Sequence, residues 1–182
     1  MRGPAHKCTT WPSAASYLTD SRIWACNAFY DVFSDYGFGF MMRNTMLYHA
    51  IKTKQVFESE MAKHDIKVKA YRVDNGRFAG LGFKEEVNKC NQITTYCGVG
   101  AHGQNVNVER HIRKVTKRAR IMLLHAKRFL SEAITHVLWP FAVTEAINAL
   151  NYLSVEKTGK TPINKFTATA AHILLRNQHA WG

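Results

Sequence analysis

The segment 106–129 constrains the fold of this chain more than any other, because it has the pattern of one long helix with two unlike faces. Its apolar residues recur at steps of three and four, the spacing that places side chains on one side of an α-helix. They are Ile112, Val115, Ala119, Met122, Leu123 and Ala126. Asn105 is the predicted N-cap. Because such a stripe must be covered, we expect this helix to pack on a sheet.

The opposite face of the predicted helix is basic. From position 110 to position 128 it carries eight cations and no acid: Arg110, Arg113, Lys114, Lys117, Arg118, Arg120, Lys127 and Arg128. Cations one turn apart repel each other unless an anion lies against them, and nucleic-acid phosphates are such anions. The formal net charge of +12 over 182 residues also favours a polyanionic partner. The first five cations of the set are therefore predicted to bind nucleic acid.

An anionic membrane is the other polyanion to consider, but the apolar stripe that would enter it is predicted to be used by the sheet. The chain also has no uninterrupted apolar window of about 18 residues and no apolar signal-peptide core near its start. We expect an intracellular protein without a membrane partner, nuclear if it acts on DNA.

Four dispersed cysteines, Cys8, Cys26, Cys90 and Cys97, predict free thiols rather than disulfides or a zinc site.

The remaining segments alternate between strand and helix patterns. Strands are predicted at 23–31, 36–42, 66–73 and 93–97, and helices at 45–65, 81–91 and 138–153, with Thr45 as the first N-cap. The short link Phe33-Ser34-Asp35 predicts an antiparallel hairpin between the first two strands. This order predicts one α/β domain, a mixed sheet flanked by helices, over 22–166. Residues 1–21 are predicted to be an irregular leader, and residues 167–182 a tail.

Two carboxylates mark the place where chemistry could occur. Asp74 directly follows the strand 66–73, and Glu109 lies in the first turn of the basic helix. Two carboxylates brought close together repel unless a divalent cation such as Mg²⁺ or Mn²⁺ neutralises them, and such ions can clamp a phosphoryl transfer. Each residue also has a simpler role, Asp74 in an Asp-Asn-Gly turn and Glu109 at a helix N-terminus. The basic helix beside Glu109 favours the metal site.

Several motifs together resemble the integrase core of copia-type long-terminal-repeat retrotransposons. The first is Tyr71 to Phe78, YRVDNGRF, and the second is Gly100 to Asn105, GAHGQN, followed by Val108-Glu109-Arg110. Further landmarks are 119–123, 138–142 and Thr161-Pro162, so the likeness covers about 23–166. The resemblance implies a ribonuclease H-like fold that performs DNA integration. It also implies that Asp74 and Glu109 belong to an Asp-Asp-Glu triad holding Mg²⁺ or Mn²⁺, and that Gln104 and Asn105 shape a loop that meets DNA.

The chain departs from the family pattern at its first strand. The family places its first catalytic Asp there, whereas no acid precedes Asp20 and residues 1–21 do not resemble that strand. Whether the first strand is present, and whether Asp20 or Asp31 replaces the missing carboxylate, stays open. Val106 stands where the family has Gly, and the chain ends inside a segment that continues in family members. We expect a truncated copy with absent or weak strand transfer.

Two other readings of the same sequence remain. The chain could be a non-catalytic DNA- or RNA-binding protein that uses the basic helix 110–128, or a relic that does not fold stably. The sequence leaves the oligomeric state open, a homo-oligomer included.

Overall fold

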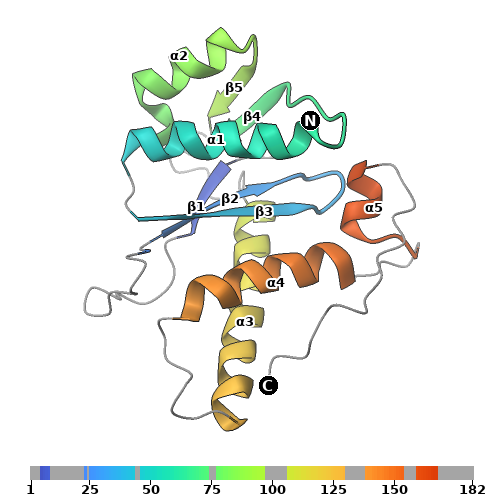
Figure 1. Cartoon of the computed structure of the whole chain (residues 1–182). Helices are drawn as coiled ribbons and strands as arrows, with labels where there is room; N and C mark the ends of the chain where they lie inside the picture. Colours follow the sequence, from blue (N-terminus) through green and yellow to red (C-terminus); the bar gives the residue numbers. More distant parts are fainter. Residues whose placement is uncertain are drawn as a thin grey trace.

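The computed structural model describes residues 5–8, 23, 25–43, 46–73, 77–96, 106–129, 138–153 and 159–167. Its strands are β1 (Ala5–Cys8), β2 (Ala25–Tyr30), β3 (Gly37–Met42), β4 (Ala70–Val73) and β5 (Ile93–Tyr96). Its helices are α1 (Leu47–Ala62), the 3₁₀ turn η2 (Arg77–Ala79), α2 (Leu81–Lys89), α3 (Val106–Phe129), α4 (Trp139–Leu153) and α5 (Pro162–Thr167). Figure 1 shows α1 on one side of β2 and β3 and α4 on the other.

The strands form an antiparallel ladder and a parallel ladder, so the predicted mixed arrangement is confirmed. β2 lies between β1 and β3 and is antiparallel to both, whereas β4 and β5 are parallel. β1 also contacts β4, which brings the two ladders together. The prediction of an irregular leader is therefore wrong at Ala5–Cys8, and the first strand is present. Its residues, AHKC, form no apolar run, so pairing with β2 rather than its own pattern determines its conformation.

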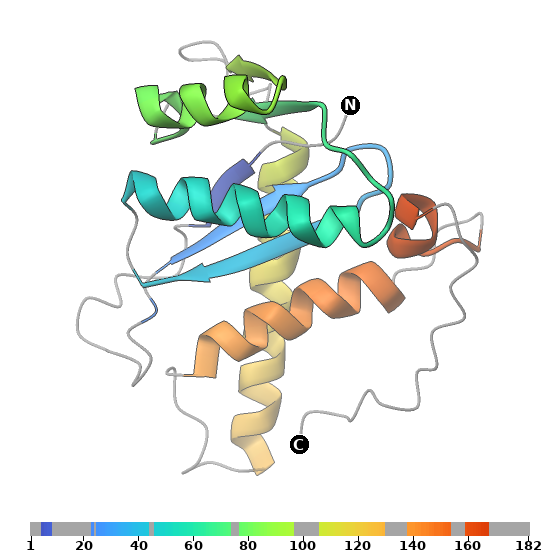
Figure 2. The ribbon, with the colours of Figure 1, turned by 45° about the horizontal axis from the view of Figure 1, so that its top comes forward.

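β2 is the centre of the domain, and all six of its residues are buried. Successive side chains of a strand point to opposite faces, and the contacts of β2 follow this alternation. Phe29 stacks on Phe57 of α1 with ring centroids 4.4 Å apart, and the Asn27 amide donates to Thr53 Oγ1 at 3.2 Å. Cys26 packs with α3 and α4 on the other face. The two helical layers therefore meet the same strand from opposite sides, as Figure 2 shows.

The β2–β3 hairpin confirms the predicted antiparallel pair and its short link. The Asp31 carboxylate fixes the turn, because its Oδ2 accepts hydrogen bonds from the Ser34 backbone N–H at 3.0 Å and the Ser34 hydroxyl at 2.6 Å. Asp35 completes the turn with a φ of 63°, in the left-handed region that Asp tolerates better than most residues. The hairpin is tied to α4 by Asn151, whose amide bonds the Gly37 N–H at 2.8 Å and the Gly37 C=O at 2.7 Å.

Three local predictions are corrected in detail. The N-cap position of α1 is occupied by Met46, which makes no side-chain cap, and not by Thr45. The predicted strand 66–73 is regular only over Ala70–Val73, although Ile66 and Val68 before it are buried. The stripe of α3 does not pack on the sheet alone, because Val115 and Ala119 share a buried cluster with α4 as well as with Cys26 of β2.

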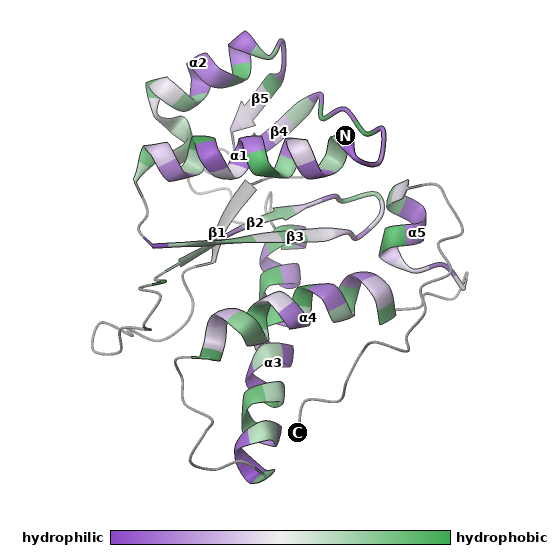
Figure 3. Ribbon diagram, viewed as in Figure 1, coloured by the Kyte–Doolittle hydropathy of each residue, from purple (hydrophilic) through white to green (hydrophobic). Residues whose placement is uncertain are grey.

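The helix α3 has the predicted length and two-faced character, which Figure 3 shows as alternating polar and apolar segments along its ribbon. Val108 and Ile112 pack on Ala28 and Tyr30 of β2, which fixes the first two turns against the hairpin. Among the described helices, none is both long and apolar enough to cross a bilayer.

Candidate nucleic-acid interface

Glu109 lies on the surface, in the first turn of α3, as predicted. A carboxylate in this place is favoured by the partial positive charge of the helix N-terminus. The next predicted carboxylate, Asp74, lies outside the described residues, as do Gln104, Asn105 and Asp20. The described strand β4 ends at Val73, the residue before Asp74. Its parallel neighbour β5 ends level with it, because Val73 pairs with Tyr96.

The first strand contributes no acid, since β1 consists of Ala5, His6, Lys7 and Cys8. Asp31, considered as a substitute ligand, is 5% exposed and its Oδ2 is used by the hairpin turn. Within the described part of the chain no three His, Cys, Asp or Glu side chains are placed to share a metal ion. Of the predicted metal ligands, the described residues therefore supply Glu109 alone, and no metal-dependent step follows from them.

The basic face of α3 is exposed to solvent, as the sequence predicts. Seven of its eight cations are exposed and Arg118 is half-buried. The ion pairs found among the described residues join Lys54 to Glu58 and Lys63 to Glu60, both on or next to α1. The cations of α3 thus form no ion pair with a described carboxylate, and they lie at 110–120 and again at 127–128 of a helix of 24 residues.

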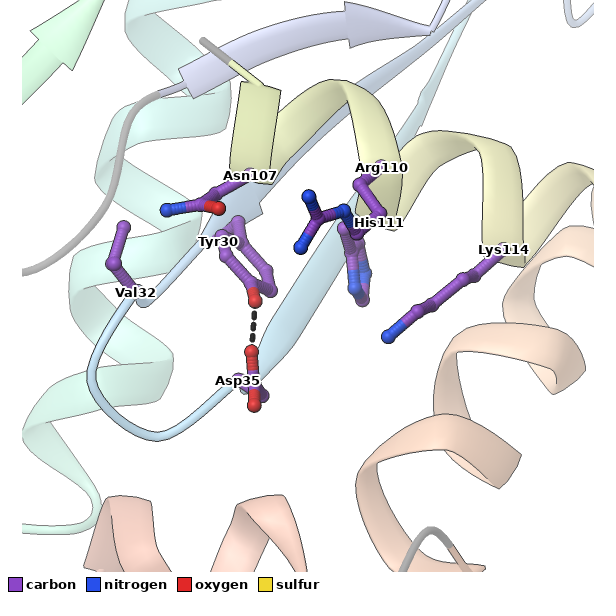
Figure 4. A pocket seen from close by; sticks show the side chains of 7 residues that line it. All are labelled: Tyr30, Val32, Asp35, Asn107, Arg110, His111 and Lys114. Carbon is purple, nitrogen blue, oxygen red and sulfur yellow. Dashed lines mark hydrogen bonds between the residues drawn. The ribbon is translucent and has the colours of Figure 1, made fainter. Parts of the chain in front are cut away.

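A cavity of about 190 Å³ opens on one flank of this face, between the start of α3 and the β2–β3 hairpin. It is lined by Tyr30, Val32 and Asp35 from the hairpin and by Asn107, Arg110, His111 and Lys114 from α3. Figure 4 shows the Tyr30 hydroxyl pointing to Asp35, to which it donates a hydrogen bond, while Arg110 and Lys114 extend from the helix on the other side. Burial and then this carboxylate raise the pKa of Tyr30, so its proton is retained at neutral pH.

His111 is the inward-facing residue of this cavity that sequence reasoning missed. It is 6% exposed, and its ring lies 4.7 Å from that of Tyr30. Burial, followed by the nearby Lys114 ammonium, lowers the pKa of His111 from 6.5 to about 4, against a smaller opposing effect of Asp35. The ring is therefore neutral at pH 7. Its spacing from Val108 and Val115, three and four residues away, places it in the buried stripe and could have identified it.

Comparison with solved structures finds retroviral integrase catalytic cores. The chain matches a chain of the simian T-cell lymphotropic virus intasome, determined by cryoEM in complex with the PP2A regulatory subunit B56 gamma, with a TM-score of 0.63, 14% identity and coverage of 82% of this chain and 50% of that chain. It matches the HTLV-2 integrase catalytic core domain in complex with magnesium, in a trimeric form, with a TM-score of 0.58, 19% identity and coverage of 78% and 84%. It matches the catalytic core domain of BIV integrase with a TM-score of 0.61, 14% identity and coverage of 79% and 86%.

The chain thus spans half of the simian viral chain, and most of the length of the two isolated core domains. No protein-family model matches it, and no curated protein does. At identities of 14% to 19%, this structural similarity is evidence for the fold alone. The chain has the mixed α/β fold of retroviral integrase catalytic cores, a ribonuclease H-like fold.

Proposed function

We propose that this chain binds nucleic acid through the basic face of α3, and that it is an integrase core of the copia type. The observation that carries the proposal is the exposed run of cations on α3, unpaired by described carboxylates, on a domain with the integrase-core fold. The phosphate backbone supplies the anions that this face needs. Arg113 and Lys117, on the outer side of the helix, are proposed to contact phosphates together with Arg110, Lys114 and Arg118.

The catalytic part of the proposal rests on Asp74 and Glu109, with Gln104 and Asn105 in the loop that meets DNA. Mg²⁺ or Mn²⁺ held there would neutralise the carboxylates and supply the means to activate an attacking hydroxyl. A retrotransposon integrase of the copia type uses a third carboxylate on its first strand, and β1 has none. We therefore propose that polynucleotidyl transfer by this chain is absent or weak.

A strand-transfer assay with the purified chain, a DNA end and Mg²⁺ or Mn²⁺ tests this part. We expect little joined product, and no further loss when Asp74→Asn is introduced. Efficient metal-dependent joining that Asp74→Asn abolishes would show that three ligands are present after all, and that a segment other than β1 provides the third.

A second candidate function is nucleic-acid binding without catalysis, which the acid-free sequence of β1 favours. The two candidates differ in what the carboxylates do. If the chain only binds, then Glu109→Gln and Asp74→Asn leave DNA affinity unchanged or slightly higher, with or without Mg²⁺. A Mg²⁺-dependent gain in affinity that Glu109→Gln removes would instead favour the integrase hypothesis.

The HTLV-2 core has been solved in trimeric and dimeric forms, and a homo-oligomer is proposed here also.

A further inference from the structure

The cavity between α3 and the β2–β3 hairpin has the properties of a site for an anionic group. Arg110 and Lys114 line it one helical turn apart, are exposed, and form no ion pair with a described residue. His111 also lines it and is 6% exposed.

This cavity lies on a different flank of α3 from Glu109. Lys114 follows Glu109 by five residues and Arg110 follows it by one, which turns them from the carboxylate by roughly 140° and roughly 100° about the helix axis. Arg120 and Lys127 follow it by eleven and eighteen residues, which returns them to within roughly 20° of Glu109. The cavity is therefore separate from the proposed catalytic position, and the two flanks can be altered independently.

The charges of the hairpin decide which ligand fits. Asp35 is the carboxylate that lines the cavity, and its Oδ1 already accepts the Tyr30 hydroxyl. Asp31 lies near Tyr30 but does not line the cavity, and its Oδ2 is held by Ser34. The lining thus offers two cations against one carboxylate, a balance that favours a singly charged anion of the size of one phosphodiester group.

The tip of the hairpin adds an exposed aromatic residue, one position along the chain from a residue that lines the cavity. Phe33 is 81% exposed and directly follows Val32, which lines the cavity and is 48% exposed. An exposed aromatic ring beside cations is the combination with which proteins bind single-stranded nucleic acids, the ring stacking on a base and the cations holding the backbone. A duplex cannot use such a ring without unstacking a base pair.

We propose that the cavity holds a phosphate of a single-stranded nucleic-acid segment between Arg110 and Lys114, and that Phe33 stacks on a neighbouring unpaired base. This inference rests on the proposed function and specifies its substrate. α3 then has two flanks with separate tasks. The Glu109 flank follows the backbone of the DNA that would be cut or joined, and the hairpin flank holds an unpaired strand.

Fluorescence anisotropy with a labelled single strand and with the matching duplex tests the inference on the full chain. The double variant Arg110→Gln/Lys114→Gln removes two charges from the cavity, and Arg120→Gln/Lys127→Gln removes two from the Glu109 flank as a matched control. We expect the first to weaken single-strand binding by about tenfold more than the control, because it loses charge-assisted hydrogen bonds to one fixed phosphate. Equal losses in the two variants would mean that the cavity is no site.

Two single variants test the anion site and the base-stacking ring separately. Asp35→Asn keeps an acceptor for Tyr30 and tolerates the φ of 63°. It removes the opposing charge, so it should strengthen binding of both probes, and weaker binding would contradict an anion site. Phe33→Ala should weaken single-strand binding by about tenfold and leave duplex binding unchanged. The same loss for both probes would refute base stacking. A native chain that binds neither probe would overturn the proposed function itself.

Discussion

At the scale of single residues, the least predictable feature is a lysine in the core. Lys54 falls on the apolar spacing of its helix, and the structure buries it completely. Its ammonium lies 3.0 Å from Glu58 Oε2 and 5.9 Å from the centre of the Tyr71 ring. The Tyr71 hydroxyl in turn donates to Glu58 Oε1 at 2.6 Å. Lys54 is fully buried and Glu58 is 23% exposed, yet no pattern in the sequence distinguishes this pair from an ordinary surface pair four residues apart.

Removing one member of this pair should be costly. Glu58→Gln leaves a buried ammonium without its counter-charge, so we expect the free energy of unfolding to fall by about 3–5 kcal/mol. Glu60→Gln is the matched control, since the Lys63–Glu60 pair has side chains 66% and 36% exposed and should contribute about 0–1 kcal/mol. Urea unfolding of both variants measures the difference. Losses of similar size would show that Lys54 is solvated, contrary to its burial here.

His111 should make the stability of the fold depend on pH. Its pKa is lowered from 6.5 to about 4, so the unfolded chain binds the proton more tightly than the folded one. The stability it contributes is complete above pH 6.5 and is lost as the pH falls toward 4. At about 1.4 kcal/mol per pKa unit the loss amounts to about 3 kcal/mol. His111→Gln should reduce the acid-induced loss by that amount in urea unfolding at several pH values. Parallel curves for the two proteins would contradict the buried, neutral histidine.

At the scale of elements, the sequence predicts those segments whose own pattern is periodic. α3 begins and ends where its stripe predicts, and the β2–β3 hairpin follows from two apolar runs and a short polar link. β1 was missed because AHKC has no apolar run and no alternation of apolar and polar residues, and the Gly and Pro residues around it are typical of irregular segments. Its conformation comes from backbone hydrogen bonds to β2, which no local window contains.

Part of the candidate site could likewise be predicted from the sequence. The exposed cations of α3 and the position of Glu109 in its first turn follow from the sequence alone. The cavity does not, because Tyr30 and Asp35 reach His111 only through the packing of the hairpin on α3. The prediction that α3 packs on a sheet is confirmed in part, because Val108 and Ile112 pack on β2. The additional cover that α4 gives to Val115 and Ala119 does not follow from the pattern of either helix.

At the scale of the whole molecule, the net charge and the exposed cations of α3 both favour the proposed nucleic-acid partner. A formal net charge of +12 attracts any polyanion, whereas α3 places part of that charge on its one exposed face. The central claim is therefore that discrete phosphate contacts on α3, rather than the diffuse charge of the chain, bind nucleic acid. The salt dependence of the affinity distinguishes discrete phosphate contacts from diffuse charge. Each phosphate contact releases counterions and adds about 0.9 to the magnitude of the slope of log affinity against log salt concentration.

The most direct measurement is this salt slope for duplex DNA, compared between the native chain and Arg113→Gln/Lys117→Gln. Both residues are exposed on the outer side of α3, so the substitutions should leave the fold intact. We predict a steep slope for the native chain and a slope smaller by about 1.8 for the variant, the loss of two phosphate contacts. An unchanged slope would contradict the claim, because it would show that α3 is not the surface that meets the DNA backbone.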